Sequence, residues 1–594
     1  MCGIFGCTGK LSMEKAWECL HTISHRGPDA QHVKALEGAV LAHARLSILD
    51  TSASANQPMA DVSGRYWIVY NGELYNYIEL RKELEEKGYP FRTAGDTEVM
   101  LYAYIEWGEE FQLKCNGMWG LAIWDDLKKT LFLSRDRFGI KPLYYYEQDG
   151  QFYFASEMKA FFPIMRHRTV NYQIFAQNAL LRYEATKECC ILGIQKILAG
   201  HCGVYEKNRL SVRRWWDTLA HVTEAPRTYQ KQVERLTELF LDACRIRMRS
   251  DVPIGTALSG GVDSSAVAGA MRKIADGDDS YVSRDWQHTF VASMPGTSID
   301  ETAYAQAASD YIGVDLKKVE ISGKISPQTL YRYMYLCEDP YLTPPVPFMQ
   351  TYGSMADAGI KVTIDGHGAD EMFGGYTFDL WHAGKDMRNS PRRLKRLLQV
   401  YNDAVTEEEK VSWDQMLCRM DALEGEEGGE SWKTGDALNR RLYEETHRQT
   451  LPTLFRCYDR YSMGNGVEIR MPFMDWRIVC FAFSIPWTSK IRNGYTKSIV
   501  RDMAAQFMDR DVIFRKRKIG FNSPVTEWFS GEWKEFLFDT VHSRDFYECG
   551  LIHPLEVCMK VQKFYSGNHS EGISGEQLWG ALVPYFWKKA VIDA

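Results

Sequence analysis

The chain has 594 residues, of which 45% are hydrophobic and 25% charged, the balance of a soluble globular protein of several domains. Its 71 Lys and Arg residues against 78 Asp and Glu residues give a formal net charge of −7, so charge offers no case for binding nucleic acid or an anionic membrane. The 14 cysteines lack the dense spacing of a disulfide scaffold. No apolar run reaches the length of about 18 residues that spans a membrane, and no basic segment precedes an apolar core at the N-terminus. We therefore expect a cytoplasmic protein.

The first informative residue is Cys2, which precedes a predicted buried strand beginning Ile4-Phe5-Gly6. If Met1 is removed, Cys2 carries both a thiol and a free α-amine. An α-amine with a pKa of about 7.7–8.0 can take the thiol proton near neutral pH, which makes Cys2 a candidate nucleophile. The alternative is that Met1 remains and Cys2 lies at a frayed end.

Residues 42–48 alternate as a strand does and place Arg45 among apolar neighbours. A guanidinium there can hold a carboxylate through two parallel hydrogen bonds. The alternative for Arg45 is a surface salt bridge.

A second predicted strand begins at Ile68 and ends in a polar turn at Asn71 and Gly72. An Asn side chain and a Gly backbone N–H at such a turn can together form an oxyanion hole. Further on, Asp96 opens a predicted helix, where it is either a site residue or only an N-cap.

An apolar run over 252–258 leads into the loop Ser259-Gly-Gly-Val-Asp-Ser-Ser265, and a predicted helix follows from Ala266. Backbone N–H groups at a strand-to-helix turn can cradle a phosphate, and the helix N-terminus adds positive potential. Asp263 would repel a bare phosphate but suits Mg²⁺ held against a polyphosphate. The alternative is an ordinary Gly-Ser turn with a helix cap.

The remainder of the chain predicts an α/β domain. An amphipathic helix is expected from Tyr229, and strand-like runs at 287–293 and 360–364 alternate with helical stretches. Such alternation favours a parallel sheet with helices on both faces, which binds ligands beyond the carboxyl ends of its strands. We expect a first domain over 1–205, a linker over 206–228 and a second domain over 229–594. Within the second domain, the charged residues 405–440 predict a solvated helix and loop.

Several motifs occur together in one order. They are Cys2-Gly-Ile-Phe-Gly, Arg26-Gly-Pro-Asp29, Arg45-Leu-Ser-Ile48, Tyr70-Asn-Gly-Glu73, Ser134-Arg-Asp-Arg-Phe-Gly-Ile-Lys-Pro-Leu-Tyr144, the 259–265 loop and Asp365-Gly-His-Gly-Ala-Asp-Glu-Met-Phe-Gly-Gly-Tyr376. The first five resemble the class II glutamine amidotransferase domain, an N-terminal-nucleophile αββα sandwich. Nearly the whole chain resembles the glutamine-hydrolysing asparagine synthetases, whose second domain has the parallel-sheet ATP pyrophosphatase fold.

The resemblance implies roles in the first domain. Cys2 would attack the glutamine amide, and Asn71 and Gly72 would stabilise the tetrahedral oxyanion. Arg45 would hold the substrate α-carboxylate, while Glu73 and Asp96 would hold its α-ammonium. The glutamine pocket would also be lined by Leu46, Ser47, Ile48 and Leu49.

The resemblance implies an ATP site in the second domain. Its residues would be Leu258, Ser259, Gly260, Gly261, Asp263, Ser264, Ser265, Ala292, Asp365, Gly366 and Lys497, with Mg²⁺ held by Asp263 and Asp370. A carboxylate acceptor would be adenylated and would then capture ammonia, with release of AMP and pyrophosphate. A homodimer is also implied.

Two departures from the family pattern leave the acceptor open. His367, a candidate catalytic residue, stands where the bacterial pattern has a Glu thought to assist the chemistry, and the substitution can equally be drift at a tolerant position. The segment 338–347 lacks the Arg expected to clamp aspartate. Residues 515–524 instead resemble a branch that amidates other acids, such as sugar uronates. Aspartate and another carboxylate therefore both remain as acceptors, and a non-catalytic relative is a distant alternative.

Overall fold

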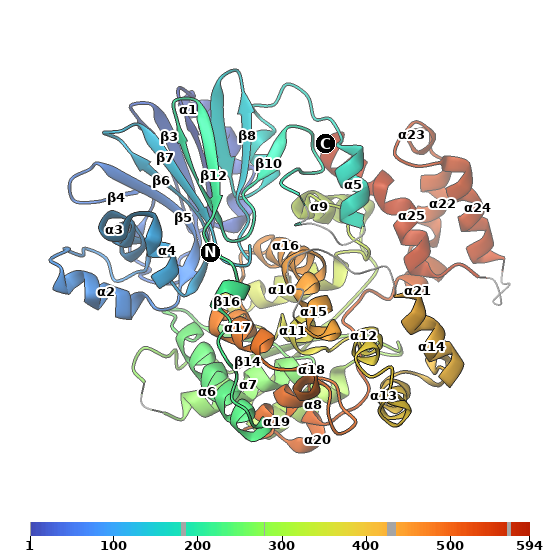
Figure 1. Cartoon of the computed structure of the whole chain (residues 1–594). Coiled ribbons are helices and arrows are strands. Elements are labelled where there is room, and N and C mark those ends of the chain that lie inside the picture. The colour runs from blue at the N-terminus through green and yellow to red at the C-terminus, as the bar shows by residue number, and fades with distance from the viewer. Residues whose placement is uncertain (1, 180–183, 185, 278, 424–434, 567–571) are drawn as a thin grey trace.

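The computed structural model describes residues 2–179, 184, 186–277, 279–423, 435–566 and 572–594. Of the solvated segment predicted over 405–440, residues 424–434 lie outside the described part. Two domains follow one another, an antiparallel sandwich and a parallel-sheet domain (Figure 1).

Two six-stranded antiparallel sheets form the described part of the first domain. The first sheet has the order β10 (Ile194–Lys196), β8 (Tyr144–Gln148), β9 (Gln151–Ala155), β1 (Cys2–Thr8), β3 (Ala39–Arg45), β2 (Ala30–Leu36). The second has the order β12 (Arg209–Arg214), β11 (His201–Glu206), β7 (Thr130–Arg135), β6 (Gly117–Asp125), β5 (Tyr66–Leu74), β4 (Met59–Ala60). The accompanying helices are α1 (Met13–His21), α2 (Tyr77–Glu86), α3 (Thr97–Trp107), α4 (Phe111–Lys114) and α5 (Tyr172–Ala179).

The first domain has four layers, in which helices, the first sheet, the second sheet and further helices pack on one another through side chains that alternate along each strand. Ile4 and Leu41 from the first sheet pack with Val69 and Leu133 from the second, which forms the core between the sheets. The opposite faces of the strands bury their apolar residues against α1 on one side and against α2 and α3 on the other. Since successive strand residues point to opposite faces, each sheet is apolar on both. The predicted αββα sandwich is confirmed.

Strand pairing corrects two boundaries. Asn71 and Gly72 do not form a turn, because β5 continues to Leu74 and pairs Asn71 with Gly120 on β6. Strand β12 pairs with β11 over its whole length, so the linker predicted over 206–228 begins later than residue 206. The tryptophan that follows it, Trp215, is stacked on the buried Trp119 and also belongs to the first domain's packing.

The second domain is built on a parallel sheet of order β15 (Leu316–Glu320), β14 (His288–Ser293), β13 (Ile254–Ala257), β16 (Val362–Ile364), β17 (Glu468–Arg470). The chain first adds β14 and β15 on one side of β13 and then adds β16 and β17 on the other. The order therefore reverses between β13 and β16, which are paired in parallel. Crevices at such a switch point, beyond the carboxyl ends of the strands, are where open α/β sheets bind ligands.

Helices cover the parallel sheet and extend the domain (Figure 1). They are α6 (Tyr229–Arg247), α7 (Val262–Ala275), α8 (Thr302–Ile312), α9 (Pro327–Cys337), α10 (Val346–Asp357), α11 (Ala369–Phe373), α12 (Asp379–Lys385), α13 (Pro391–Ala404), α14 (Trp413–Ala422), α15 (Ala437–His447), α16 (Thr450–Met463), α17 (Trp476–Ser484), α18 (Trp487–Lys490), α19 (Ser498–Ala504) and α20 (Arg510–Ile513). The C-terminal group, α21 (Val525–Ser530), α22 (Lys534–His542), α23 (Arg544–Tyr547), α24 (Pro554–Tyr565) and α25 (Gly575–Trp587), shares its core with the first sheet.

Arg26, whose side chain is fully buried, joins the two domains. Its guanidinium donates to Glu157 at 2.7 Å and to Asp459 on α16 at 2.8 Å, and its Nε donates to the Cys2 carbonyl at 3.0 Å. Burial alone would raise the pKa of Asp459, but Arg26 and Lys141 lower it to about 2. Asp459 is therefore ionised at neutral pH and depends on its cationic partners.

Replacing Arg26 with alanine is expected to lower the free energy of unfolding by about 3–5 kcal/mol, because it removes a fully buried cation from the Glu157 and Asp459 carboxylates that it pairs with. The matched control is Arg65→Ala, which removes a more exposed ion pair with Asp125 (2.7 Å) in the same domain and should cost about 0–1 kcal/mol. Urea unfolding midpoints of the two variants measure the difference. Equal shifts would contradict the structural role of Arg26.

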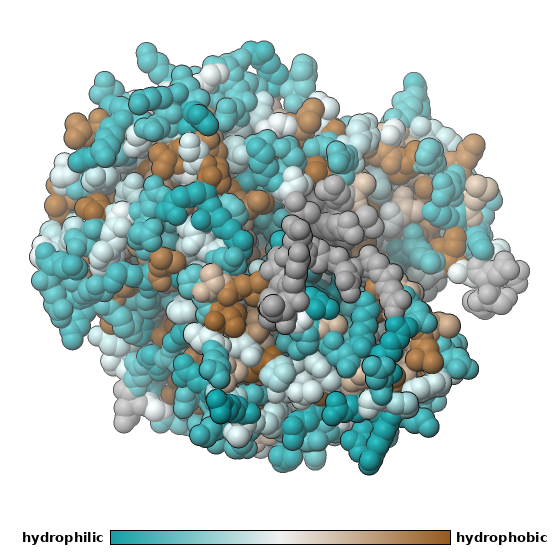
Figure 2. Space-filling view, in the orientation of Figure 1, coloured by the Kyte–Doolittle hydropathy of each residue, from teal (hydrophilic) through white to brown (hydrophobic). Residues whose placement is uncertain are grey.

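The hydropathy of the surface agrees with the composition, which is that of a globular chain with 25% charged residues. The face seen in Figure 2 is mostly hydrophilic, and its hydrophobic residues lie in small groups. Among the described residues, no helix combines the length and apolar character needed to cross a bilayer. All 14 cysteines are free thiols and most are buried, as expected for a chain without a disulfide scaffold.

Candidate functional site

Two cavities contain most of the predicted site residues. The first is small, about 30 Å³, and lies beside β1, β3 and β5. It is lined by Cys2, Arg45, Leu46, Ile48, Leu49, Ala55, Gln57, Met59, Tyr70, Gly72, Glu73, Thr93, Gly95, Asp96 and Thr97. Of the predicted glutamine-site residues, Ser47 and Asn71 do not line it. Sequence reasoning missed Gln57, Thr93 and Thr97, which carry no motif of their own and reach the cavity only through the fold. It also gave no role to Tyr70, although this residue begins the Tyr70-Asn-Gly-Glu73 motif.

Strand pairing positions Cys2. It lies opposite Arg45 in the β1–β3 ladder, and its backbone nitrogen donates to Asn71 Oδ1 at 3.1 Å. The side chain of Asn71 is therefore engaged with the nucleophile candidate itself, while Gly72 faces the cavity. A Cβ at Gly72 would lie 2.3 Å from the Met118 carbonyl oxygen, so only glycine fits between these strands. Burial raises the pKa of the Cys2 thiol, so a nearby base is needed to form the thiolate.

Arg45 is buried and does not make a surface salt bridge. Its guanidinium donates to the Ser52 carbonyl at 2.6 Å and to Asn56 Oδ1 at 2.7 Å, and it also contacts the Asp50 carbonyl. These neutral acceptors hold the 50–56 loop around the guanidinium without neutralising its charge. A positive charge of this kind beside a cavity favours a bound carboxylate.

Glu73 and Asp96 form an acidic wall of the first cavity. Asp96 accepts hydrogen bonds from the Leu74 backbone at 2.9 Å and from the Tyr70 hydroxyl at 3.0 Å. It occupies the N-cap position of α3, as the alternative predicted, but among the described residues its side chain makes no capping bond to that helix. Glu73 pairs with Arg470 of the second domain at 3.2 Å. Burial raises the pKa of both carboxyl groups. A bound ammonium group would favour their ionised forms.

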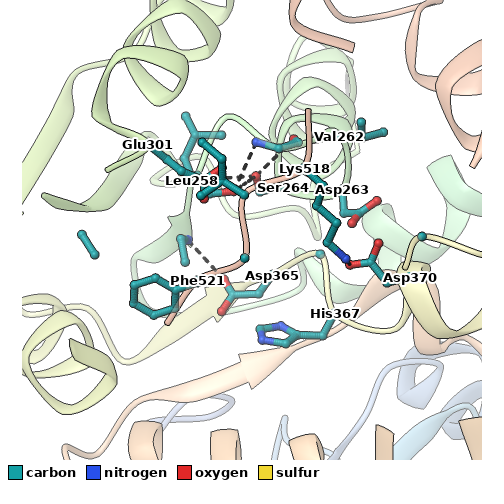
Figure 3. A pocket seen from close by; sticks show the side chains of 18 of the residues that line it. Leu258, Val262, Asp263, Ser264, Glu301, Asp365, His367, Asp370, Lys518 and Phe521 are labelled. Atoms are coloured by element: carbon teal, nitrogen blue, oxygen red, sulfur yellow. Dashed lines mark hydrogen bonds and ion pairs between the residues drawn. The ribbon is translucent and has the colours of Figure 1, made fainter. Parts of the chain in front are cut away.

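The second cavity is larger, about 400 Å³, and lies at the switch point between β13 and β16 (Figure 3). Of the predicted ATP and metal residues it is lined by Leu258, Ser259, Gly261, Asp263, Ser264, Ala292, Asp365, Gly366, Asp370 and Lys497, and His367 lines it as well. Gly260 and Ser265 do not line it. We refer to this space as the main cavity.

The predicted phosphate loop forms a tight turn ahead of α7. Gly260 adopts φ +69°, and a Cβ there would lie 2.3 Å from the Tyr304 carbonyl carbon. The Gly261 N–H donates to Ser259 Oγ at 3.2 Å, and the Ser259 and Ser264 hydroxyls are 3.1 Å apart. Helix α7 begins at Val262, earlier than predicted. Its first residues, Val262 and Asp263, line the main cavity, so its N-terminus faces that space. This geometry suits an anion.

Lys497 links the two predicted metal ligands. The Lys497 ammonium group lies 2.7 Å from Asp263 and 2.6 Å from Asp370. Lys518, which is labelled in Figure 3 with Asp263 and Asp370, lies 2.9 Å from Asp370. Burial would lower the pKa of Lys497, but the two carboxylates raise it. Asp263 Oδ1 is buried and has no hydrogen-bond partner in the described part of the chain. Among the described residues, no group of three or more His, Cys, Asp and Glu side chains could hold a metal.

A basic segment to which the sequence analysis assigned no site residues borders the main cavity. Arg515, Arg517 and Lys518 line it, together with Arg501. Arg515 is paired with Glu301 at 3.0 Å. The run of cations at 515–518 was visible in the sequence, but its position beside Asp370 depends on tertiary packing.

Asp365 and His367 have different surroundings. Asp365 accepts from the Ala257 backbone at 3.1 Å, from Thr363 Oγ1 at 2.7 Å and from the Tyr352 hydroxyl at 3.0 Å, so it ties the ends of β13 and β16 together. The His367 ring lies edge-on to Tyr458 with centroids 4.0 Å apart. Its Nδ1 is buried, and no described residue makes a hydrogen bond to it. Desolvation lowers the pKa of His367, so the ring is neutral near pH 7. It does not reproduce the charge of a glutamate.

The fold and the two cavities define a two-domain protein in which an N-terminal-nucleophile sandwich precedes a parallel-sheet α/β domain. Residues 1–216 match the glutamine amidotransferase domain family, and residues 235–585 match the asparagine synthase family. The chain therefore belongs to the asparagine synthase family, with a class II glutamine amidotransferase domain at its N-terminus.

Individual relatives agree with this assignment. Asparagine synthetase [glutamine-hydrolyzing] 3 of Bacillus subtilis (strain 168) is 30% identical, over 87% of this chain and 86% of that protein. Asparagine synthetase [glutamine-hydrolyzing] 1 of the same organism is 28% identical, over 100% of this chain and 97% of that protein. Asparagine synthetase B [glutamine-hydrolyzing] of Escherichia coli (strain K12) is 29% identical, over 70% of this chain and 72% of that protein.

Proposed function

We propose that the protein uses glutamine and ATP to convert a carboxylic acid into its amide, with release of glutamate, AMP and pyrophosphate. One observation carries the proposal. One chain contains two sites. In the first, the buried Cys2 lies with Arg45 and the acidic pair Glu73 and Asp96. In the second, the 259–265 loop lies with Asp263, Asp370 and Lys497. The first set suits an amino-acid amide and the second suits a polyphosphate.

In the proposed first half-reaction, removal of Met1 frees the α-amine of Cys2, which accepts the thiol proton. The sulfur attacks the glutamine amide carbon, and the tetrahedral intermediate then loses ammonia, which leaves a glutamyl thioester on Cys2. Water hydrolyses this thioester to glutamate and restores the thiol. The Gly72 N–H and the Asn71 amide stabilise the oxyanion. Arg45 holds the substrate α-carboxylate, and Glu73 and Asp96 hold its α-ammonium.

In the proposed second half-reaction, a carboxylate oxygen of the acceptor attacks the α-phosphorus of ATP, and pyrophosphate leaves. Ammonia then attacks the acyl-adenylate carbon and AMP leaves. The α7 N-terminus and the 259–265 loop would cradle the phosphates, and Lys497 would neutralise the departing pyrophosphate.

The residues present fit Mg²⁺ together with ATP. Carboxylate oxygens are ligands that Mg²⁺ prefers, the phosphates would complete its coordination, and the unpartnered Asp263 Oδ1 offers a ready ligand. Asp263 and Asp370 would hold the ion, and when bound it would neutralise phosphate charge. Dimerisation stays a prediction.

The test supplies glutamine, ATP and Mg²⁺ with a panel of acids that includes aspartate, other amino acids, sugar uronates and apolar monocarboxylates. We expect glutamate, AMP and pyrophosphate in a ratio of about 1:1:1 with at least one acid, since one ammonia is consumed for each adenylate. If none of the acids increased pyrophosphate release, the proposed synthetase function would be overturned, even if glutamine were still hydrolysed.

A further inference from the structure

An additional pocket of about 370 Å³ opens beside the main cavity, and we call it the side pocket. The two spaces share Ile299, Tyr341, Leu454, Tyr458, Gly520 and Phe521 as walls. Beyond these the side pocket is lined by Thr343, Phe348, Cys457, Tyr461 and Asn522. Its volume lies in the range of about 300–1,000 Å³ that is typical of pockets for small molecules. The side pocket is thus large enough for a molecule in addition to the contents of the main cavity.

The walls of the side pocket are aromatic. The Phe348 ring is stacked on Tyr461 with centroids 4.6 Å apart and meets Phe521 edge-on at 4.7 Å. The Tyr458 ring packs edge-on against Phe348 at 5.6 Å and against His367 at 4.0 Å. Mutual packing leaves these rings little freedom, so they form fixed apolar surfaces that suit a flat or apolar ligand.

None of the described residues that line the side pocket is charged. The basic side chains nearby, Lys497, Arg501, Arg515, Arg517 and Lys518, line the main cavity only. Phe521 belongs to the wall shared by the two spaces, and in the view of Figure 3 it is drawn on one side of Asp365 while Asp370 is drawn on the other. A ligand in the side pocket therefore extends away from the cations that suit phosphate.

The acidic residues of the 338–347 segment do not serve the side pocket. Glu338 is paired with Arg460 at 2.9 Å and accepts from the Lys159 backbone at 2.6 Å, within the domain interface. Asp339 lies 3.6 Å from Arg456. The segment presents Tyr341 and Thr343 to the pocket instead.

We propose that the acceptor is a carboxylic acid with an uncharged, largely apolar body, which occupies the side pocket with its carboxylate directed past Tyr458 into the main cavity. This rests on the proposed function, whose activated carboxylate it identifies by class. Aspartate would place an α-ammonium and an α-carboxylate among side chains that offer neither charge a partner, and burying an unpaired charge is costly. An apolar skeleton gains from the same walls.

The first test compares acids in the ammonium-supported reaction, measured as pyrophosphate release from ATP. The probes are hexanoate, phenylacetate and 3-phenylpropionate against aspartate and glucuronate. We expect kcat/KM for the best apolar acid to exceed that for aspartate and glucuronate by about tenfold or more. Faster release with aspartate or glucuronate would overturn the apolar assignment while leaving the synthetase function intact. If none of the acids supported pyrophosphate release, both the apolar assignment and the proposed synthetase function would be overturned.

The second test locates the acid. Thr343→Trp fills the side pocket and is expected to raise KM for the best apolar acid at least about tenfold, with KM for ATP within about twofold. Leu342→Trp is the matched control, because Leu342 is the neighbouring residue but is 42% exposed and lines neither cavity. Glutamine hydrolysis in the first domain reports whether each variant is folded. If Thr343→Trp lost that activity, Asn522→Trp would replace it. If a folded Thr343→Trp or Asn522→Trp variant kept the parent KM for the acid, the acid would not bind in the side pocket.

Discussion

The variant Cys2→Ala is expected to lose glutamine hydrolysis by at least about 10³-fold while it keeps amide formation from added ammonium. The sulfur is the only atom of the first cavity assigned to attack the amide, and alanine offers no replacement. Cys2 is absent from the lining of the main cavity, so ammonium should still react there at a rate within about twofold of the parent. Glutamate release and ammonium-dependent pyrophosphate release measure the two halves separately.

The matched control is Cys7→Ala, on the same strand. Cys7 is buried like Cys2, but it packs into the core shared with α1 and lines neither cavity. It should keep glutamine hydrolysis within about twofold, subject to a modest loss of stability from the missing sulfur. A Cys2→Ala variant that releases glutamate at the parent rate would rule out Cys2 as the nucleophile.

The parts predicted best from sequence were those specified by local chemistry. The 259–265 loop combines an apolar run, two glycines and a helix start, and each of these constrains the backbone directly. The parallel sheet likewise follows from alternating strands and helices, and its switch point places Ser259 and Asp365 beside the same cavity. The chemical roles of the first cavity came chiefly from the resemblance, since Arg45 or Asp96 alone was equally compatible with a structural role.

The parts that were missed depend on contacts between distant segments. Asn71 accepts from the Cys2 backbone only because β1 and β5 stack in adjacent sheets, and Glu73 finds its partner Arg470 in the other domain. The side pocket similarly draws Phe348, Tyr458 and Phe521 from three segments that are far apart in the sequence. Of these segments, only residues 515–524 were singled out in the sequence, and nothing local places Phe521 beside the other two rings. The linker boundary was predicted too early because nothing local shows that β12 pairs with β11.

These contacts also connect the two proposed half-reactions. Arg26 contacts both the Cys2 carbonyl and Asp459, and Asp459 is the residue after Tyr458, which separates the main cavity from the side pocket. In the proposed reaction, ammonia released beside Cys2 must reach the acyl-adenylate unprotonated, because ammonium has no free electron pair for attack. The buried ion pairs of Arg26 with Glu157 and Asp459 join the domain that carries Cys2 to the domain that carries the main cavity.

A second large effect is expected for Asp263→Ala, which should lower acceptor-dependent pyrophosphate release by about 10²–10³-fold and leave glutamine hydrolysis within about twofold of the parent. Asp263 lies in the first turn of α7, 2.7 Å from Lys497, and lines the main cavity. Its removal takes away one proposed Mg²⁺ ligand and one of the two carboxylates that hold Lys497 in place. Both losses weaken the neutralisation of the leaving pyrophosphate.

Asp276→Ala is the control on the same helix. Asp276 caps the C-terminal end of α7, where it lies 3.5 Å from Arg272 and outside both cavities. Pyrophosphate release by this variant should match the parent. The conservative variant Asp263→Asn separates charge from shape, because it keeps the side-chain volume but removes the negative charge that a metal needs. We expect it to resemble Asp263→Ala, with a higher Mg²⁺ concentration needed for half-maximal rate. Pyrophosphate release by Asp263→Ala at the parent rate would show that neither metal binding nor the position of Lys497 depends on this carboxylate.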